Sequence, residues 1–519
     1  MTSVLPAGVS ALSFRLDETA VPYLALFATL WLLSGVYAAA TVPRGRRAAL
    51  FAYYVPSAVG GIMVALAADA VAFYLCFALM AIPAWGLITH ANTPEARRAG
   101  TIYLTLTVIG EAALLAALML MVAETGTVEL GALAAAIPAS GSRDLVMGLL
   151  LAAIGLKVGA LPVSGVLPLS YTYTPAGAAS ALAGASVKVG ALAMLRLLPA
   201  GGLPEGWASG VMALGLATAF TAALLGVLTT APRAVLGYSS ASQMGLVLVA
   251  AGAGLADSNA ASLAAAAIVA FSLHHGLAKS ALVLGDDAVS RSTGRMRTAA
   301  LAGLALPALA LVGVPLTSGF VAKYALKDAL HALSGAVPHS VETLLPWTAV
   351  GTAALMLRFF ALTRRQAPAA DHARPLWLPA ALWAVLLVLV AFTCWLWPAE
   401  WSAHALASAL SPASMWAALW PGLVAVVLAL LLGRVPRFTS ADGLVPPGDW
   451  LGPATRGISS LFGRETESAD APGSDTHGTT ALAAIGRTAV TGERMLVAWT
   501  VAAAVFVTLA VLLVGIATR

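Results

Sequence analysis

Long apolar stretches alternate with short polar connections along almost the whole chain. Because about 20 apolar residues in a helix cross the hydrocarbon core of a bilayer, the pattern predicts an all-α polytopic membrane protein with about 14 transmembrane helices. A barrel would need alternating segments of about 10 residues, and the sequence shows no such series. The predicted spans are residues 21–42, 48–68, 70–90, 102–123, 145–170, 177–198, 207–231, 234–254, 259–284, 299–333, 343–363, 376–397, 413–433 and 495–517.

Two of these spans are too long for one straight helix, and both are interrupted by proline and glycine. The first interruption is LPVSGVLPLSYTYTPAG (161–177), and the second is VGVPLTSG (312–319). Proline removes a helical hydrogen bond, and glycine loosens the backbone. In a bilayer such breaks persist only where they face protein or a water-filled cavity. We therefore expect both breaks to lie inside the protein.

The broken spans also indicate a repeat. The second to sixth spans (48–198) and the seventh to eleventh (207–363) form two units of five helices, each with its broken helix in fourth place. An odd number of crossings inverts the second unit relative to the first, and inverted repeats with discontinuous helices are typical of transporters. The predicted fold is two inverted five-helix repeats, each with a broken helix, within a transmembrane core over 21–433.

Arginines orient this core in the membrane. They cluster in the connections that follow odd-numbered spans, whereas the connections after even-numbered spans hold few, chiefly Arg143. The positive-inside rule then places the segment 1–20 outside the cytoplasm and the arginine-bearing connections inside it. The polar stretch 434–494 is predicted to be a cytoplasmic linker, and 495–519 to contain a C-terminal transmembrane helix.

Composition excludes several classes of protein. Of the 519 residues, 60% are hydrophobic and only 10% are charged, whereas a soluble domain has about 25% charged residues. The net charge of +5 is explained by membrane topology, so we expect the lipid bilayer and no nucleic acid as a partner. There are two cysteines and no CxxC pair. This argues against zinc and iron–sulfur sites, and we expect neither a metal nor a cofactor.

A few ionisable residues fall inside the predicted spans, where a charge costs several kcal/mol unless it faces protein or water. Burial favours the neutral form of lysine, so a buried lysine can load and release a proton near neutral pH. Glu111 has no basic neighbour on its own helix, and Lys157 is its expected partner. His274 is expected to be structural, and Asp286 and Asp287 to end a helix at the surface. The residues predicted to carry protons are Glu111, Lys157, Lys188, His275, Lys279 and Lys323.

Several stretches together resemble the antiporter-like subunits of respiratory complex I, Mrp-type cation/proton antiporters and related membrane hydrogenases. They are GLKVGALPVSGVLPLSYTYTPAGAASALAGASVKVGALAMLR (155–196), LGYSSASQMGLVLVAAG (236–252), HHGLAKSALVLG (274–285) and GVPLTSGFVAKYAL (313–326), within a similarity over residues 13–400. The resemblance implies that Lys157, on the broken seventh helix of the family, is the central proton carrier and that Lys188 matches a lysine of the family's eighth helix. It also implies that His275 and Lys279 belong to a central polar axis, and that Lys323 lies near its exit.

Three departures from the family accompany this resemblance. The family's fifth helix carries a glutamate that pairs with the central lysine, and Ala78 stands there in YLCFALMAIPAW (74–85). Glu111 on the next helix is expected to substitute for it. Two histidines common near the first break are replaced by Ser164 and Tyr171. The chain is also expected to begin at the family's third helix, so that a separate small subunit supplies the first two.

These observations lead to a main functional prediction with two alternatives. The main one is a proton- or cation-translocating subunit of a multi-subunit complex-I-like or Mrp-like assembly in the bacterial inner membrane. One alternative is the membrane subunit of a proton-driven inorganic-carbon uptake complex, and another is a degenerate structural membrane subunit. The sequence contains no phosphate-binding loop, dinucleotide fingerprint or nucleophile elbow. Catalysis by the chain alone is not expected, although it could be a subunit of a redox-driven ion-translocating oxidoreductase.

Overall fold

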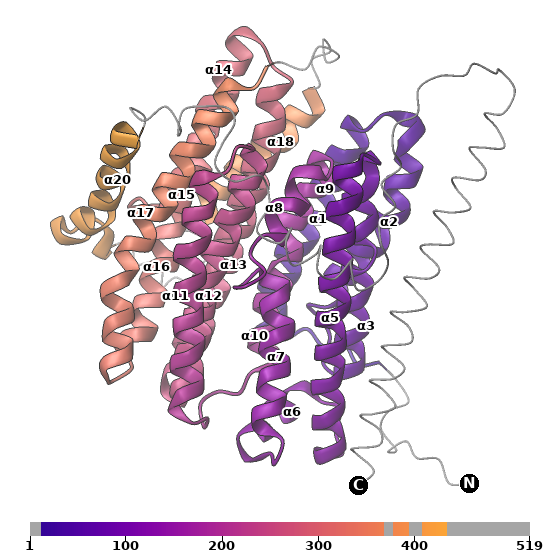
Figure 1. Ribbon diagram of the computed structural model, residues 1–519, viewed down its shortest axis with the longest axis vertical. Helices are drawn as coiled ribbons and strands as arrows, with labels where there is room; N and C mark the ends of the chain where they lie inside the picture. The colour runs from indigo at the N-terminus through magenta and orange to yellow at the C-terminus, as the bar shows by residue number, and fades with distance from the viewer. Residues whose placement is uncertain (1–11, 368–376, 394–406, 433–519) are drawn as a thin grey trace, which may run out of the picture. The chain divides into compact units, whose positions relative to one another are not determined.

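The computed structural model describes residues 12–367, 377–393 and 407–432, all of which belong to one compact unit, Met1–Asp449. The predicted linker over 434–494 and the predicted helix over 495–517 lie outside the described residues. Figure 1 shows long helices running side by side in alternating directions. In the described part, ten helices are long and apolar enough to cross a membrane. The predicted all-α polytopic membrane fold is confirmed.

The first repeat follows the helix α1 (Ala20–Thr41). Its fourth element is broken between α7 and α8, and a short π-helical turn, η3, interrupts its fifth. The elements are α2 (Arg44–Met63), α3 (Ala70–Ala81) with α4 (Ala84–Ile88) and η1 (Thr89–Ala91), α5 (Pro94–Thr125), α6 (Leu130–Ala136) with η2 (Ile137–Ala139), α7 (Arg143–Val158), α8 (Val166–Tyr173), α9 (Ala176–Ala181), η3 (Leu182–Ser186) and α10 (Lys188–Leu197).

The second repeat has the same order of elements, and its fourth helix is broken between α15 and α16. Its elements are α11 (Glu205–Leu228), α12 (Pro232–Ala256), α13 (Ser258–Ser290), α14 (Gly294–Gly303), α15 (Ala305–Val312), α16 (Ser318–His331) and α17 (Ala336–Arg365); α18 (Trp377–Phe392) and α20 (Pro412–Leu432) follow it. Each of the first thirteen predicted spans falls on one of these helices or interrupted helices.

Both breaks begin at a glycine with a left-handed backbone. Gly159 ends α7 with a φ of 71°, and Gly313 ends α15 with a φ of 85°. A residue with a side chain is strained in this region, so glycine is the usual helix terminator there. Pro162 and Pro315 follow within three residues, and a proline cannot donate the hydrogen bond that would continue the preceding helix. The two predicted breaks are confirmed.

An equivalent contact in each repeat supports the inverted symmetry. In the first repeat, Arg196 on the fifth helix donates to the carbonyl of Ala65, just after the first helix, at 3.4 Å. In the second, Arg358 on the fifth helix donates to the carbonyl of Thr229, at the end of the first helix, at 3.1 Å. Because each repeat has an odd number of crossings, the two contacts fall at opposite ends of the helical bundle.

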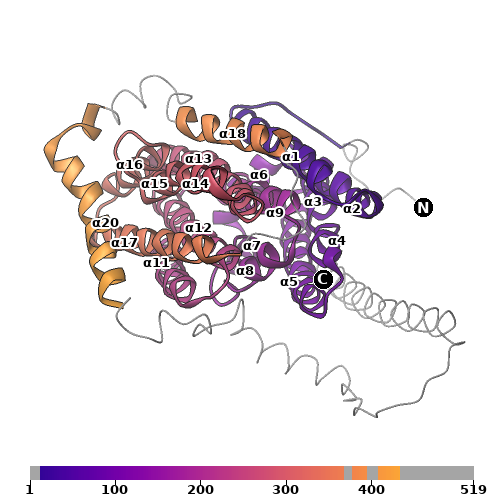
Figure 2. The ribbon, with the colours of Figure 1, turned by 90° about the horizontal axis from the view of Figure 1, so that it is seen from above.

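The two repeats meet along α13. Figure 2 shows the first repeat (α2 to α10) beside the second (α11 to α17), with α12 and α13 in the interior. Helix α13 contacts α9, η3 and α10 of the first repeat as well as α12 and α16 of the second. All of the most apolar window of α12 is buried inside the protein. The polar groups within this window of α12 therefore face protein rather than lipid.

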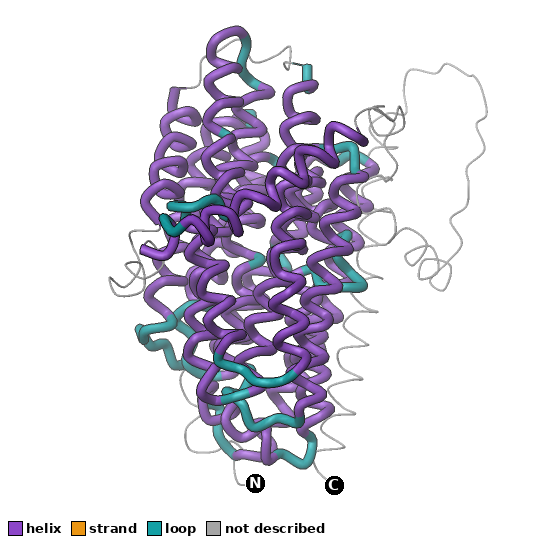
Figure 3. Tube along the Cα trace, turned by 90° about the vertical axis from the view of Figure 1, so that its left-hand side faces the viewer, coloured by secondary structure: helices purple, strands orange, loops and turns teal. Residues whose placement is uncertain are grey.

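Helix α20 packs differently from the others. It has the length and hydropathy of a membrane span, and it packs on α17. Figures 2 and 3 show it lying across α17, at a steep angle to the long helices rather than alongside them. Trp420 and Val424 pack against a small cluster with Val350 and Ala353 of α17.

Candidate functional site

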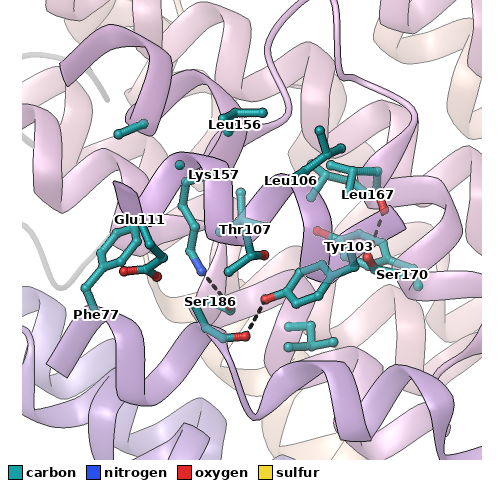
Figure 4. Close-up of a pocket in the computed structure, with 17 residues that line it drawn as sticks. Phe77, Tyr103, Leu106, Thr107, Glu111, Leu156, Lys157, Leu167, Ser170 and Ser186 are labelled. Atoms are coloured by element: carbon teal, nitrogen blue, oxygen red, sulfur yellow. Dashed lines mark hydrogen bonds between the residues drawn. The ribbon is translucent and has the colours of Figure 1, made fainter. Parts of the chain in front are cut away.

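The first group of predicted residues meets in a cavity of about 50 Å³, which is enough for a few water molecules. The cavity is bounded by α3, α5, α7, α8 and η3. Figure 4 shows the Lys157 side chain pointing toward Ser186, with Glu111 and Phe77 on its other side. Lys157 lies in the last turn of α7, directly before the break, and Glu111 lies in the middle of α5.

The Lys157 ammonium has two close neighbours. Its Nζ donates to the Ser186 hydroxyl at 3.3 Å and lies 5.1 Å from the centre of the Phe77 ring, within cation–π range. Helix α3 thus presents an aromatic ring to the lysine, next to Ala78. This contact was not anticipated from the sequence, because a phenylalanine in an apolar helix gives no local signal.

Glu111 is 4% exposed, and neither of its carboxylate oxygens has a hydrogen-bond partner among the described residues. It interacts electrostatically with Lys157, although the two do not form a direct ion pair. The expected pairing across helices is thus present as a shared cavity rather than as a salt bridge. A buried carboxylate needs hydrogen-bond partners, and water in this cavity can supply them.

The second group lies where the repeats meet. Lys188, His275 and Lys279 are each fully buried and interact with one another electrostatically. The Lys188 Nζ donates to the Ala183 carbonyl at 2.6 Å, and the Lys279 Nζ donates to the Leu236 carbonyl at 3.1 Å. Both nitrogens of His275 lack a partner among the described residues.

Two glycines allow η3 of the first repeat and α13 of the second repeat to lie in close contact. A Cβ at Gly184 in η3 would lie 2.9 Å from the Gly276 carbonyl oxygen and 2.0 Å from the Ser280 hydroxyl. A Cβ at Gly276 in α13 would likewise lie 2.9 Å from the Gly184 carbonyl oxygen. The backbones of η3 and α13 are therefore in contact without side chains between them. This contact brings Lys188 of the first repeat next to His275 of the second.

The third group lies at the second break. The Lys323 Nζ reaches back from α16 to the carbonyl of Val312, the last residue of α15, at 2.5 Å. His274 accepts or donates a hydrogen bond with the Ser318 hydroxyl at 2.8 Å, and it interacts electrostatically with both Lys323 and Lys279. His274 thus lies between the second and third groups, a position that the sequence analysis did not give it.

Further polar atoms with no hydrogen-bond partner among the residues that the structure describes occur in the same region. They are the hydroxyls of Ser164 and Ser239, and the Tyr171 hydroxyl lies beside that of Ser240. Buried polar atoms are nearly always hydrogen-bonded, and water is the usual partner when protein is not. The hydroxyls of Ser164 and Ser239 can bind water. The interior along α8, α12 and α13 is therefore suited to hold water.

Lysine has an unusual distribution in this chain. The sequence contains five lysines, and these are Lys157, Lys188, Lys279, Lys323 and Lys327. Every other basic side chain apart from histidine is an arginine, and the arginines fall mainly in connections and at helix ends. Arginine cannot release its proton in a protein, whereas lysine can. Four of the five lysines belong to the three groups above.

The prediction for Asp286 and Asp287 is wrong. Both lie within α13 and are buried, at 3% and 6% exposed. Ion pairs with Arg233 on α12 and with Arg291, just after α13, balance their charges. The pair with Arg233 joins two helices, so the spacing of residues along one helix could not show it. Among the described residues, no group of three or more His, Cys, Asp or Glu side chains could hold a metal ion.

Inverted repeats with lysines at their broken helices define an antiporter-like membrane protein. The chain belongs to the NADH:quinone oxidoreductase/Mrp antiporter transmembrane family, whose model matches residues 67–344. NADH-quinone oxidoreductase subunit N of Cereibacter sphaeroides is 33% identical over 327 residues, which cover 61% of this chain and 69% of that protein. Hydrogenase-4 component B of Escherichia coli is 23% identical over 432 residues, covering 76% of this chain and 64% of that protein.

Two further comparisons define the extent of the similarity. An uncharacterized protein of Mycobacterium tuberculosis is 31% identical over 64% of this chain and 54% of its own length, so the chain spans about half the length of that relative. Among solved structures, the Mrp complex from Dietzia sp. matches with a TM-score of 0.63 at 20% identity, covering 98% of this chain and 57% of the other. This likeness supports the fold. The resemblance expected from the motifs is confirmed.

Proposed function

We propose that the chain translocates protons, or another small cation, as a membrane subunit of a complex-I-like or Mrp-like assembly in the bacterial cytoplasmic membrane. One observation carries the proposal. Three groups of ionisable side chains inside the protein follow one another from α5 to α16, and the Glu111 carboxylate and the His275 ring among them have no hydrogen-bond partner among the described residues. The names of the relatives support membership of a multi-subunit complex.

The order of transfer follows the contacts. Glu111 and Lys157 share one cavity, and Ser186, which accepts from Lys157, also lines it. Lys188 lies two residues beyond Ser186 and interacts with His275 and Lys279. The proton route then continues through His274 to Lys323. Water between these groups would complete each transfer.

Electrostatic repulsion between the lysines favours the movement of protons along the route. Lys188, Lys279 and Lys323 donate to backbone carbonyls, and none of them forms an ion pair with a carboxylate among the described residues. Neighbouring cations repel one another, so the protons of such a cluster are held and released as a coupled set. A proton that arrives at one lysine therefore favours release from the next.

The test uses charge-conserving variants in the assembly that co-purifies with the full chain in mild detergent. Lys157→Arg and Lys323→Arg keep a positive charge but remove a releasable proton. Lys327→Arg is the matched control, one turn beyond Lys323 on the same helix. After reconstitution into vesicles, we expect the first two variants to lose driven proton movement and the control to retain it. Unchanged movement in all three would refute the proposal and favour a structural subunit.

A further inference from the structure

A compact ion-pair cluster lies beyond Lys279, at the end of the bundle where the arginine-bearing connections gather. Arg233, at the start of α12, pairs through Nε with Asp286 at 3.2 Å and through Nη2 with Asp287 at 3.5 Å. Its Nη1 donates to the carbonyl of Thr174, just after α8, at 3.1 Å. We call Arg233, Asp286, Asp287, Arg291 and Tyr37 the Arg233 cluster.

The remaining contacts tie further helices to the two aspartates. Asp287 accepts from the Tyr37 hydroxyl of α1 at 2.8 Å and from the Arg291 Nε at 2.5 Å. Asp286 accepts from the Thr363 hydroxyl in the last turn of α17 and from the Gln366 amide just after that helix, both at 3.1 Å. The cluster therefore joins α1, the first repeat through α8, and three helices of the second repeat.

The Arg233 cluster differs from the three groups of the site in one physical respect. All four carboxylate oxygens and all three guanidinium nitrogens of Arg233 have partners, and two aspartates balance two arginines. In the site, by contrast, Glu111 and His275 have no hydrogen-bond partner in the part of the chain that the structure describes. A neutral and fully paired cluster needs no water to satisfy its hydrogen bonds, whereas the unpartnered groups of the site do need it.

The sequence positions on α12 and α13 give the distance of the Arg233 cluster from Lys279. Asp286 lies seven residues beyond Lys279 on α13, which is two turns on the same helical face, or roughly 10 Å. Arg233 lies three residues from Leu236, whose carbonyl accepts from Lys279. Between them, Leu282 and Val283 are both 0% exposed. An apolar turn and then a paired ionic layer therefore separate Lys279 from this end of the bundle.

We propose that the Arg233 cluster, together with this apolar turn, is a seal that closes the polar interior against direct proton exchange with the nearby surface. The inference rests on the proposed function, since a seal matters only if the interior carries protons. A buried ion pair that loses one partner leaves an uncompensated charge, which draws water into the gap. Opening the seal would therefore create a leak that passes through Lys279.

The test measures passive proton flux in vesicles that contain the full chain in its co-purified assembly. The double change Asp286→Asn with Asp287→Asn keeps the side-chain size and removes both negative charges. We expect a several-fold rise in passive flux. The matched control is Asp17→Asn, which removes the acid of the Asp17–Arg196 ion pair at the opposite end of the bundle, and it should leave passive flux at the wild-type level.

Adding Lys279→Gln to the double variant identifies the route of the leak. We expect passive flux to return to the wild-type level, because the leak passes through that lysine. A leak that Lys279→Gln does not reduce, or that Asp17→Asn produces equally, would overturn the proposal. Tyr37→Phe removes one hydrogen bond to Asp287 and serves if the double variant does not fold. It should raise passive flux to a smaller extent, and an unchanged flux would overturn the seal.

These results separate the seal from the proposed function. If Lys157→Arg and Lys323→Arg abolish driven transport while the aspartate variants show no leak, the proposal of a seal is wrong and the proposed proton route is supported. If Lys157→Arg and Lys323→Arg leave driven transport intact, the proposed function fails, and the inference fails with it.

Discussion

Replacing Gly184 with alanine tests whether the two repeats must touch at η3 and α13. The added Cβ would lie 2.9 Å from the Gly276 carbonyl oxygen, whereas close carbon–oxygen contacts measure about 3.3–3.6 Å. The α13 backbone must therefore move away by about 0.4–0.7 Å. The Cβ would also displace the Ser280 hydroxyl, which donates to the Ser180 carbonyl at 3.0 Å.

The energetic cost follows from these contacts. Overpacking of a filled interior costs about 1–3 kcal/mol, and loss of the Ser280 hydrogen bond adds about 1 kcal/mol. Alanine is better than glycine in a helix by up to about 1 kcal/mol, which offsets part of this. We expect Gly184→Ala to destabilise the protein by about 1–3 kcal/mol in total. Because the shift separates Lys188 from His275, proton transport should fall by about tenfold.

Thermal unfolding in detergent and driven proton transport in vesicles measure the two effects. Gly148→Ala is the matched control, because a Cβ at Gly148 on α7 meets nothing within 4 Å. This control should be as stable as the wild type or slightly more stable, and it should transport normally. If Gly184→Ala matches Gly148→Ala in both assays, the close approach of the repeats is not required and the reasoning is wrong.

Three further outcomes are expected. Glu111→Gln should abolish driven proton transport without lowering thermal stability, because it removes the proton-carrying group that shares a cavity with Lys157; transport at the wild-type rate would show that the acid is not on the route. Burial raises the pKa of Asp17, but the hydrogen bonds and charge of Arg196 outweigh it and hold that pKa below its ordinary value. The ion pair should therefore stabilise the protein above pH of about 4 and lose this effect as the pH falls further. Below that pH, the unfolding temperature of Asp17→Asn should consequently decrease less steeply with falling pH than that of the wild type. Gly313→Ala should lower thermal stability by about 1–2 kcal/mol, the cost of a left-handed residue with a side chain; unchanged unfolding would contradict the strained geometry of the second break.

The sequence by itself determined the fold class, both helix breaks and the residues worth testing. Apolar length sets the spans because lipid cannot hydrogen-bond a bare backbone. Proline and glycine mark the breaks for equally local reasons. A lysine or glutamate within an apolar span is also visible without any structure, because its cost in lipid makes it rare.

Only the tertiary structure decided which of these groups are neighbours. It placed the Phe77 ring beside Lys157, His274 between Lys279 and Lys323, and the two aspartates inside α13 rather than at its surface. Each of these depends on contacts between helices far apart in the sequence. Hydropathy reports how a residue partitions between lipid and water, and it carries no information about which helix supplies the partner that makes a buried charge tolerable.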